Sequence, residues 1–494
     1  MQNIIQLDPR DNVCVAVLPL HAGTRAECAG QALTTAEEIT SGHKLALRDI
    51  GEGEHVIKYG ASIGLATRNI RKGEHIHSHN LRTGLSGLLE YAYPGTPEPG
   101  KALPPRTFMG YMRPDGSAGT RNDIYIVPTV GCVNGTARTL ARMASERFPN
   151  AADSFLALTH DMGCSQLGED MECTRSLLAG LIRNPNAGGV LVLGLGCENN
   201  YVDSFRPYLK DCRAERIRFL VAQECEDEIE RGMQLLEELA HLTARDRRCE
   251  LPASYLTLGF KCGGSDAFSG ITANPLCGRI ADRLTAMGGK CILTEVPEMF
   301  GAEQILLDRC ADLETFEAAV GMINGFKAYY IRHGQPIYEN PSPGNKEGGI
   351  TTLEEKSLGC IRKGGDAIVT DVLPMGGFVR RPGLSLLTGP GNDLISCTNL
   401  AAAGASLIVF TTGRGNPFCA PVPTVKLASN TPMASRKQNW IDYSAGALLE
   451  SGDFDAEAER FMDYLLRVAS GECLTRGEQN GSRGIALFRD GVIL

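Results

Sequence analysis

Histidines are concentrated at the start of the chain, and three of them alternate with other residues. Six of the nine histidines precede residue 80, and single residues separate His75, His77 and His79. Residues two apart on a β-strand point to the same face, so these imidazoles are expected side by side. Neutral imidazole binds transition metals, so the pattern predicts a metal site on these three residues. The alternative is a solvated edge strand that carries polar residues without a ligand.

Two neighbours of these histidines extend the predicted site. His43 lies upstream in the same segment, and His43 and His77 are our candidates for general acid and base. An imidazole can hold or release a proton near neutral pH, which suits that role. Asn80 follows the last histidine, and its amide can orient the hydroxyls of a substrate.

A glycine-rich loop over residues 261–275 offers a second group of ligands. Gly264, Ser265 and Asp266 combine a free backbone with a hydroxyl and a carboxylate. Such a loop can bind a carboxylate or several hydroxyls through backbone N–H groups and short polar side chains. The same residues can also cap the start of a helix, and the two roles are compatible.

Acidic and basic residues follow two other predicted strands. Glu295 and Glu298 come after the strand at residues 290–294 and form an alternative metal site, or an acidic first turn of a helix. Lys346 lies in a long polar loop, and Arg414 lies in a glycine-rich turn after the strand at 406–410. Either cation can bind a substrate carboxylate, or can simply be solvated on the surface.

The cysteines do not specify a cofactor. The chain has 17 of them, none in a Cys-x-x-Cys pair, and we expect reduced thiols. Several lie at glycine-rich strand ends where no dinucleotide fingerprint is present, so we expect no NAD. An iron–sulfur cluster requires converging thiolates, but this spacing does not indicate one and we do not expect a cluster. The cysteines considered for it are Cys132, Cys164, Cys197, Cys262 and Cys397.

The elements that position these residues change character along the chain. Residues 1–93 alternate short apolar runs with turns and predict a small β-rich domain. Residues 94–106 are rich in proline and glycine and predict a linker. Residues 107–250 and 251–494 alternate strands with helices, which predicts an α/β body with mostly parallel sheets in two subdomains.

Bulk properties limit the class of protein. The 494 residues carry a formal net charge of −9, which argues against a nucleic-acid partner. No apolar stretch approaches the ~20 residues that cross a bilayer. The start of the chain lacks the pattern of a secretory signal. We therefore expect a cytoplasmic protein with no membrane partner.

Several motifs resemble one family across nearly the whole chain. The N-terminal segment resembles a SAF-type domain at Gly42-His43-Lys44, residues 56–60 and residues 75–80. The rest resembles the altronate and galactarate dehydratase family, which is also related to sulfolactate sulfo-lyase. The matching stretches are residues 110–116, 119–122, 263–266, 295–298 and 340–345.

The resemblance implies a metal-dependent hydro-lyase of hexuronate catabolism. It implies D-altronate as the sugar acid, 2-dehydro-3-deoxy-D-gluconate plus water as products, and Fe²⁺ or Mn²⁺ as the metal. The alternatives are a galactarate dehydratase or related lyase, and a sugar-acid-binding protein without turnover. We expect the α/β body to hold the substrate while the small domain folds back over it, in a homo-oligomer, provisionally a dimer. The body residues assigned to the substrate are Arg121, Asn122, Gly264, Ser265, Asp266, Lys346 and Arg414.

Overall fold

The N-terminal domain is a set of short antiparallel strands, as the sequence predicts. The computed structural model describes residues 3–28, 30–85, 87–98 and 100–491. One sheet has the order β1-β2-β5-β8, a second has the order β6-β7-β9, and β3 pairs with β4. The strands are β1 (Ile4–Ile5), β2 (Val13–Ala16), β3 (Arg25–Cys28), β4 (Gln31–Thr34), β5 (Lys44–Ala46), β6 (His55–Lys58), β7 (Ala61–Ala66), β8 (His75–Ile76) and β9 (Leu81–Arg82).

The histidine strand is shorter than the sequence predicts. β8 ends at Ile76, and the chain then turns. The Asn80 side chain makes this turn, because its Oδ1 accepts from the His77 backbone N–H at 2.9 Å and its Nδ2 donates to the His75 carbonyl at 2.8 Å. The histidines are therefore gathered by a strand and a tight turn together.

The linker lies against the C-terminal domain. Residues 94–98 and 100–106 form neither a helix nor a strand, and the next strand begins directly after Arg106. Just before them, Tyr93 packs against Phe316 with ring centroids 5.3 Å apart. Lys327 donates to the Tyr91 hydroxyl at 3.1 Å. These contacts anchor the segment that enters the linker.

The second domain is a four-stranded parallel sheet between helices. Its order is β13-β12-β14-β15. Helices α1 and α4 share a core on one face, while α2 packs with α10 of the next domain on the other. A small antiparallel sheet, β11-β10-β16, joins this domain to the next. The elements are β10 (Thr107–Met112), β11 (Ala118–Gly119), β12 (Asp123–Pro128), α1 (Asn134–Arg147), β13 (Phe155–Ala157), α2 (Gly168–Arg183), β14 (Ala187–Gly194), α3 (Val202–Phe205), β15 (Ile217–Val221), α4 (Glu228–Thr243) and β16 (Cys249–Pro252).

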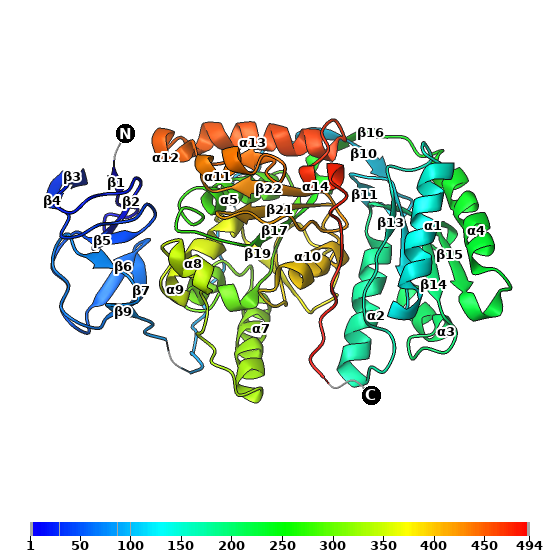
Figure 1. Cartoon of the computed structure of the whole chain (residues 1–494), viewed down its shortest axis with the longest axis horizontal. Coiled ribbons are helices and arrows are strands. Elements are labelled where there is room, and N and C mark those ends of the chain that lie inside the picture. The colour runs from blue at the N-terminus through cyan, green and yellow to red at the C-terminus, as the bar shows by residue number, and fades with distance from the viewer. Residues whose placement is uncertain (1–2, 29, 86, 99, 492–494) are drawn as a thin grey trace.

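The third domain is built on a seven-stranded parallel sheet, β19-β20-β18-β17-β21-β22-β23. Helices α5 and α13 share the core of one face, and α10 covers the other (Figure 1). The strands are β17 (Thr257–Cys262), β18 (Lys290–Leu293), β19 (Val369–Leu373), β20 (Gly383–Leu387), β21 (Leu407–Thr412), β22 (Thr424–Ala428) and β23 (Tyr443–Ser444). The helices are α5 (Ala273–Ala286), α6 (Glu303–Leu307), α7 (Leu313–Arg332), α8 (Pro343–Glu347), α9 (Leu353–Cys360), α10 (Asp393–Ala402), α11 (Thr431–Arg436), α12 (Leu448–Ser451), α13 (Phe454–Ala469) and α14 (Arg476–Gln479).

This arrangement confirms the predicted α/β body with parallel sheets behind a β-rich domain. None of the helices in the described parts of the chain is long and apolar enough to cross a membrane.

Candidate functional site

A buried group of thiols and carboxylates lies at the carboxyl edge of the third-domain sheet. Cys262 ends β17, and Glu298 follows β18, the next strand in the sheet. The Cys262 Sγ lies 2.8 Å from Glu298 Oε2 and 3.5 Å from the Sγ of Cys360, the last residue of α9. Carboxyl ends of adjacent parallel strands share one edge, which is where open α/β sheets bind ligands.

Three buried lysines balance this negative charge. Lys356 Nζ lies 2.8 Å from Glu298 Oε1. Lys261 pairs with Glu295 and lies 3.0 Å from Asp393 Oδ1, and Lys363 lies 3.7 Å from Glu295 Oε2. An unpaired buried charge is very costly, so each of these lysines and its carboxylate partner must be buried together.

The pKa values of this group reflect the pairing. Hydrogen bonding from Cys360 lowers the pKa of the Cys262 thiol to about 6, although burial opposes this shift. Burial alone would raise the pKa of Glu298, but Lys356 and Lys363 bring it well below its ordinary value. Glu298 is therefore anionic at neutral pH and accepts a hydrogen bond from the Cys262 thiol, whose proton is readily lost. Anionic sulfur and oxygen at this spacing can bind a cation.

Glu295 reaches this group through an uncommon backbone conformation. Its φ of 70° lies in the left-handed region, which residues other than glycine rarely adopt. Its Oε2 accepts from the Cys262 backbone N–H at 3.0 Å. Such conformations persist where the surroundings enforce them, and they are concentrated at functional sites.

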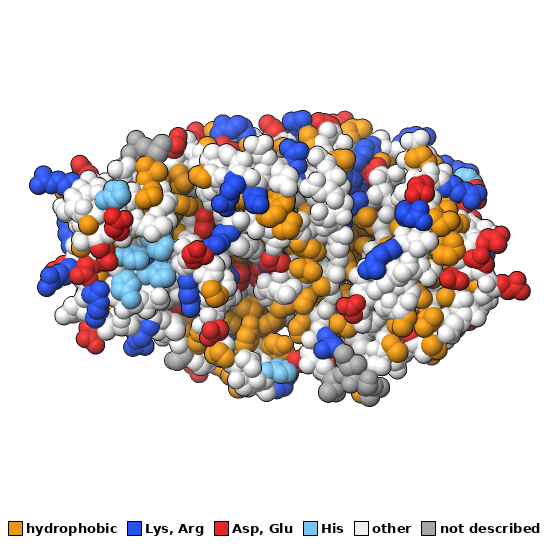
Figure 2. Space-filling view, viewed as in Figure 1, with side chains coloured by type: hydrophobic (Ala, Val, Ile, Leu, Met, Phe, Trp, Pro, Cys, Tyr) orange, Lys and Arg blue, Asp and Glu red, His pale blue; other side chains and the backbone are white. Residues whose placement is uncertain are grey.

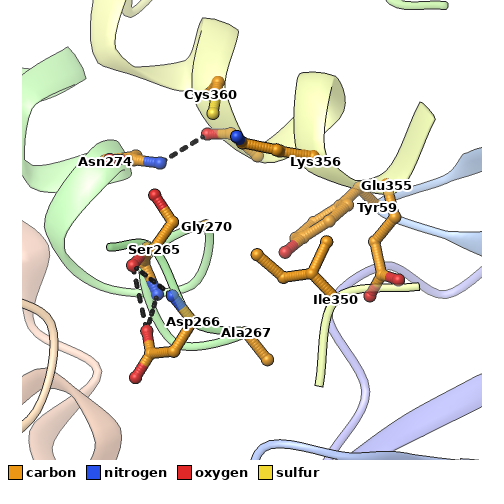
Figure 3. Close-up of a pocket in the computed structure, with 12 residues that line it drawn as sticks. Tyr59, Ser265, Asp266, Ala267, Gly270, Asn274, Ile350, Glu355, Lys356 and Cys360 are labelled. Carbon is orange, nitrogen blue, oxygen red and sulfur yellow. Dashed lines mark hydrogen bonds between the residues drawn. The ribbon is translucent and has the colours of Figure 1, made fainter. Parts of the chain in front are cut away.

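A narrow pocket borders the buried group, and the small domain helps to form it (Figure 3). Tyr59 of the small domain reaches Gly270, where a methyl group would collide with the Tyr59 hydroxyl. The pocket is polar on most sides. Its other lining residues include Ser265, Asp266, Asn274, Ile350, Glu355, Lys356 and Cys360.

The side chain of Asp266, which lines this pocket, is held in one orientation by hydrogen bonds. Its Oδ1 accepts from the Ser269 backbone N–H at 2.9 Å and from the Ser429 hydroxyl at 2.8 Å, and Asn430 Nδ2 donates to its Oδ2 at 3.0 Å. Burial raises the pKa of Asp266 despite these hydrogen bonds. A fixed, buried carboxyl of this kind can hydrogen-bond a polyol.

Buried ion pairs attach the small domain beside the pocket. Glu355 Oε2 lies 2.9 Å from Lys44 Nζ, and its Oε1 lies 2.7 Å from Lys58 Nζ. All three side chains are at most 1% exposed. Lys44 and Lys58 overcome the effect of burial and lower the pKa of Glu355 to about 2.

The structure brings the predicted histidines together on the face of the small domain seen in Figure 2. The His43 Nδ1 lies 2.9 Å from His75 Nε2, and the rings of His75 and His79 are 5.4 Å apart. The Nε2 atoms of His43 and His77 face the backbone carbonyls of Glu347 (3.2 Å) and Lys346 (2.9 Å). Burial lowers the pKa of His75 to about 3 and also lowers those of His43 and His77. These three rings are therefore neutral at pH 7.

The histidine group and the pocket both contact residues 346–349. The carbonyl of Gly348 accepts from the Ala267 backbone N–H at 2.9 Å, next to the pocket residue Asp266. Arg414 joins the same segment, through Glu347 Oε2 at 2.7 Å and the Gly344 carbonyl at 3.0 Å.

Of the predicted substrate residues, Ser265 and Asp266 line the pocket, and Gly264 precedes them with a φ of 64°. The structure places three others outside it. Asn80 is fully buried in the histidine turn. Arg121 binds Glu478 at 2.7 Å, and Asn122 donates to the Thr243 carbonyl at 3.0 Å. Asn80 stabilises a turn, Arg121 joins the second domain to the third, and Asn122 holds the interior of the second domain, roles that sequence motifs alone did not distinguish from substrate contacts.

Sequence motifs did not reveal the part of the site that α9 contributes. Lys356 and Cys360 are four residues apart, so they lie on one face of this helix. The sequence of α9 is charged and looks like a surface helix, yet all its residues are buried. The available signal for a buried site was the run of charged residues in α9, shortly after the glycine-rich segment 344–349.

Comparisons with known proteins agree with these features. Models of the altronate/galactarate dehydratase SAF domain, of the second domain of D-galactarate dehydratase/altronate hydrolase, and of the D-galactarate/altronate dehydratase C-terminal domain match residues 2–84, 110–243 and 253–493. The altronate dehydratase of Bacillus subtilis is 49% identical, with both chains covered completely. That of Escherichia coli is 47% identical over 99% of each chain. The L-threo-forming galactarate dehydratase of Escherichia coli is 33% identical over 97% of this chain and 94% of its own. The chain therefore belongs to the altronate and galactarate dehydratase family.

Proposed function

We propose that this protein dehydrates D-altronate to 2-dehydro-3-deoxy-D-gluconate and water. The observation that carries the proposal is the 47–49% identity to two altronate dehydratases over almost the full chain, against 33% to the galactarate enzyme. A polar pocket lined in part by Lys356 supports it, because a sugar acid needs hydrogen bonds along its hydroxyls and positive charge at its carboxylate.

We assign a divalent metal to Cys262, Glu298 and Cys360. Among the described residues, this group alone brings three ligand atoms within 4.8 Å of one another. Two sulfurs and a carboxylate suit Fe²⁺ better than Mn²⁺, which favours oxygen ligands. The histidine set His75, His77 and His79 is the competing site. It is less well prepared, because His77 Nε2 faces a carbonyl and His75 Nε2 faces His43.

The reaction breaks the C2–H and C3–O bonds and forms a C2=C3 double bond, and the resulting enol becomes the 2-keto acid. A bound metal would stabilise the negative charge that develops on the substrate carboxylate. Lys356 lines the pocket beside Glu298 and can pair with that carboxylate. Ser265 and Asp266 orient the hydroxyls. His43 and His77 start as neutral imidazoles, so one of them takes the C2 proton as a base and the imidazolium formed delivers that proton to the leaving C3 oxygen. Either role requires movement of residues 346–349.

The test is formation of a 2-keto acid by protein first freed of metal and then supplied with Fe²⁺ or Mn²⁺. Altronate and galactarate are compared at equal concentration. We expect turnover of altronate, with a higher kcat/KM than for galactarate. Binding of altronate without a 2-keto acid under either metal would indicate a binding protein and overturn the proposal. Faster turnover of galactarate would overturn the choice of substrate.

A further inference from the structure

Three exposed cysteines follow three adjacent strands of the second domain. Cys132 follows β12, Cys164 follows β13 and Cys197 follows β14. These strands are parallel and neighbour one another in the order β13-β12-β14. Their carboxyl ends therefore lie at one edge of the sheet, which α3 marks at the lower right of Figure 1. Elsewhere in the described residues the only exposed cysteine is Cys249.

The three cysteine loops are tied to one another by backbone contacts. The Gly131 N–H donates to the Met162 carbonyl at 3.0 Å, which joins the first loop to the second. Asn200, in the third loop, donates from its backbone to the Gly163 carbonyl at 2.9 Å and from its side chain to the Thr129 carbonyl at 3.1 Å. A methyl group at Gly163 would overlap the Thr129 carbonyl. The cysteines are therefore presented by loops that are packed together without room for larger residues.

Two of the three sulfurs have a side chain that can donate to them. Gln223 Nε2 lies 3.5 Å from Cys197 Sγ, and the Ser165 hydroxyl lies 3.9 Å from Cys164 Sγ. Ser165 adopts a left-handed φ of 57°, fixed by Asn199 Oδ1 accepting from its N–H at 2.7 Å. Donors aimed at sulfur stabilise the thiolate, which is the form that binds metal. Three accessible thiols without a ligand would instead be open to oxidation.

We propose that Cys132, Cys164 and Cys197 bind an iron–sulfur cluster through their thiolates, leaving one iron without a protein ligand. The three thiols are carried to one edge of the sheet by loops that hydrogen-bond to one another, which is an arrangement that can hold several irons through thiolates. From the sequence we expected no cluster, because the cysteine spacing does not indicate one, and the five cysteines considered included Cys262 and Cys397. Both of those are buried in the third domain, on β17 and α10. The cluster site does not depend on the metal site of the proposed function.

The test is iron and acid-labile sulfide per chain, measured on full-length protein purified without oxygen and reconstituted with iron and sulfide. Wild-type protein is expected to bind both, with visible charge-transfer absorption. The single variants Cys132→Ser, Cys164→Ser and Cys197→Ser are expected to lose most of the labile sulfide. Cys249→Ser, also an exposed thiol, is the matched control and retains it. Cys360→Ser retains it as well, which separates this site from the proposed catalytic metal.

Alkylation of the wild-type chain gives a second readout that no folding defect can mimic. Before reconstitution all three thiols are expected to react with iodoacetamide, and afterwards they are protected while Cys249 still reacts. Wild-type protein without labile sulfide, protection of these three thiols by iron or zinc alone, or serine variants with undiminished sulfide would each overturn the proposal. If wild-type protein carries normal labile sulfide but does not turn over altronate, that result would instead count against the proposed function.

Discussion

Replacing Glu355 with glutamine should loosen the small domain from the body. The change removes the one negative charge between Lys44 and Lys58, at 2.9 and 2.7 Å, where all three side chains are at most 1% exposed. The pKa of Glu355 is about 2 rather than 4.5. That shift corresponds to about 3 kcal/mol of preference for the charged form in the folded protein. Breaking a buried pair by removing one partner costs roughly 3–5 kcal/mol, which agrees.

The sign of the pH dependence follows from the lowered pKa. The contribution of Glu355 is complete above pH 4.5 and is lost as the pH falls toward 2. Wild type should therefore exceed Glu355→Gln by about 3 kcal/mol at pH 7, and the difference should shrink by about 1 kcal/mol near pH 3.5.

Hydrogen exchange of the amides in β5 and β6, together with urea unfolding, measures this difference. The matched control is Glu347→Gln, because Glu347 is 73% exposed and its pair with Arg414 is worth only about 0–1 kcal/mol. Equal protection and equal stability of the two variants would refute the assigned role of the buried ion pairs.

Three further predictions concern packing, pH and the domain seam. Gly270→Ala should displace Tyr59 and lower both thermal stability and altronate turnover. Adding Tyr59→Phe to the same chain should restore part of the loss. An unchanged melting temperature of Gly270→Ala would contradict this contact. Burial raises the pKa of Asp123 to about 6. As the pH rises from 4 to 6, the free energy of unfolding of wild type should therefore fall by up to about 3 kcal/mol relative to that of Asp123→Asn. A difference between the two proteins that stays constant with pH in urea titrations would argue against that shift. Arg121→Lys should lower the free energy of unfolding but leave KM for altronate unchanged; a raised KM would return Arg121 to the substrate site.

The sequence was sufficient to predict the fold because its signals are local. Continuous apolar runs such as residues 189–196 and 406–410 predict buried parallel strands, and the proline-rich segment after Tyr93 predicts the linker. The predicted histidine strand was too long, because the Asn80 side chain forms a turn after Ile76. A side chain that bonds its own backbone in this way competes with the strand.

The site could be predicted only in part, because its residues come from segments far apart in the chain. Ser265, Asp266 and Glu298 lie at strand ends, where sequence signals are strong. Cys360 and Lys356 lie on a buried helix whose charges look solvent-exposed in sequence, and only the fold shows that Glu298 neutralises Lys356. Arg121 was assigned to the substrate because a buried structural arginine and a ligand-binding one have the same local sequence.

The most direct test of the central claim is metal content measured together with altronate turnover in ligand variants. Glu298→Gln and Cys360→Ser are compared with His75→Ala and with the distant control Cys249→Ser, each supplied with Fe²⁺ after chelation. The proposed site predicts that the first two variants lose both the iron that is bound without added sulfide and 2-keto acid formation. It also predicts that His75→Ala and Cys249→Ser keep the iron. Retention of iron by Glu298→Gln and Cys360→Ser, with its loss in His75→Ala, would contradict the assignment and place the metal on the small domain.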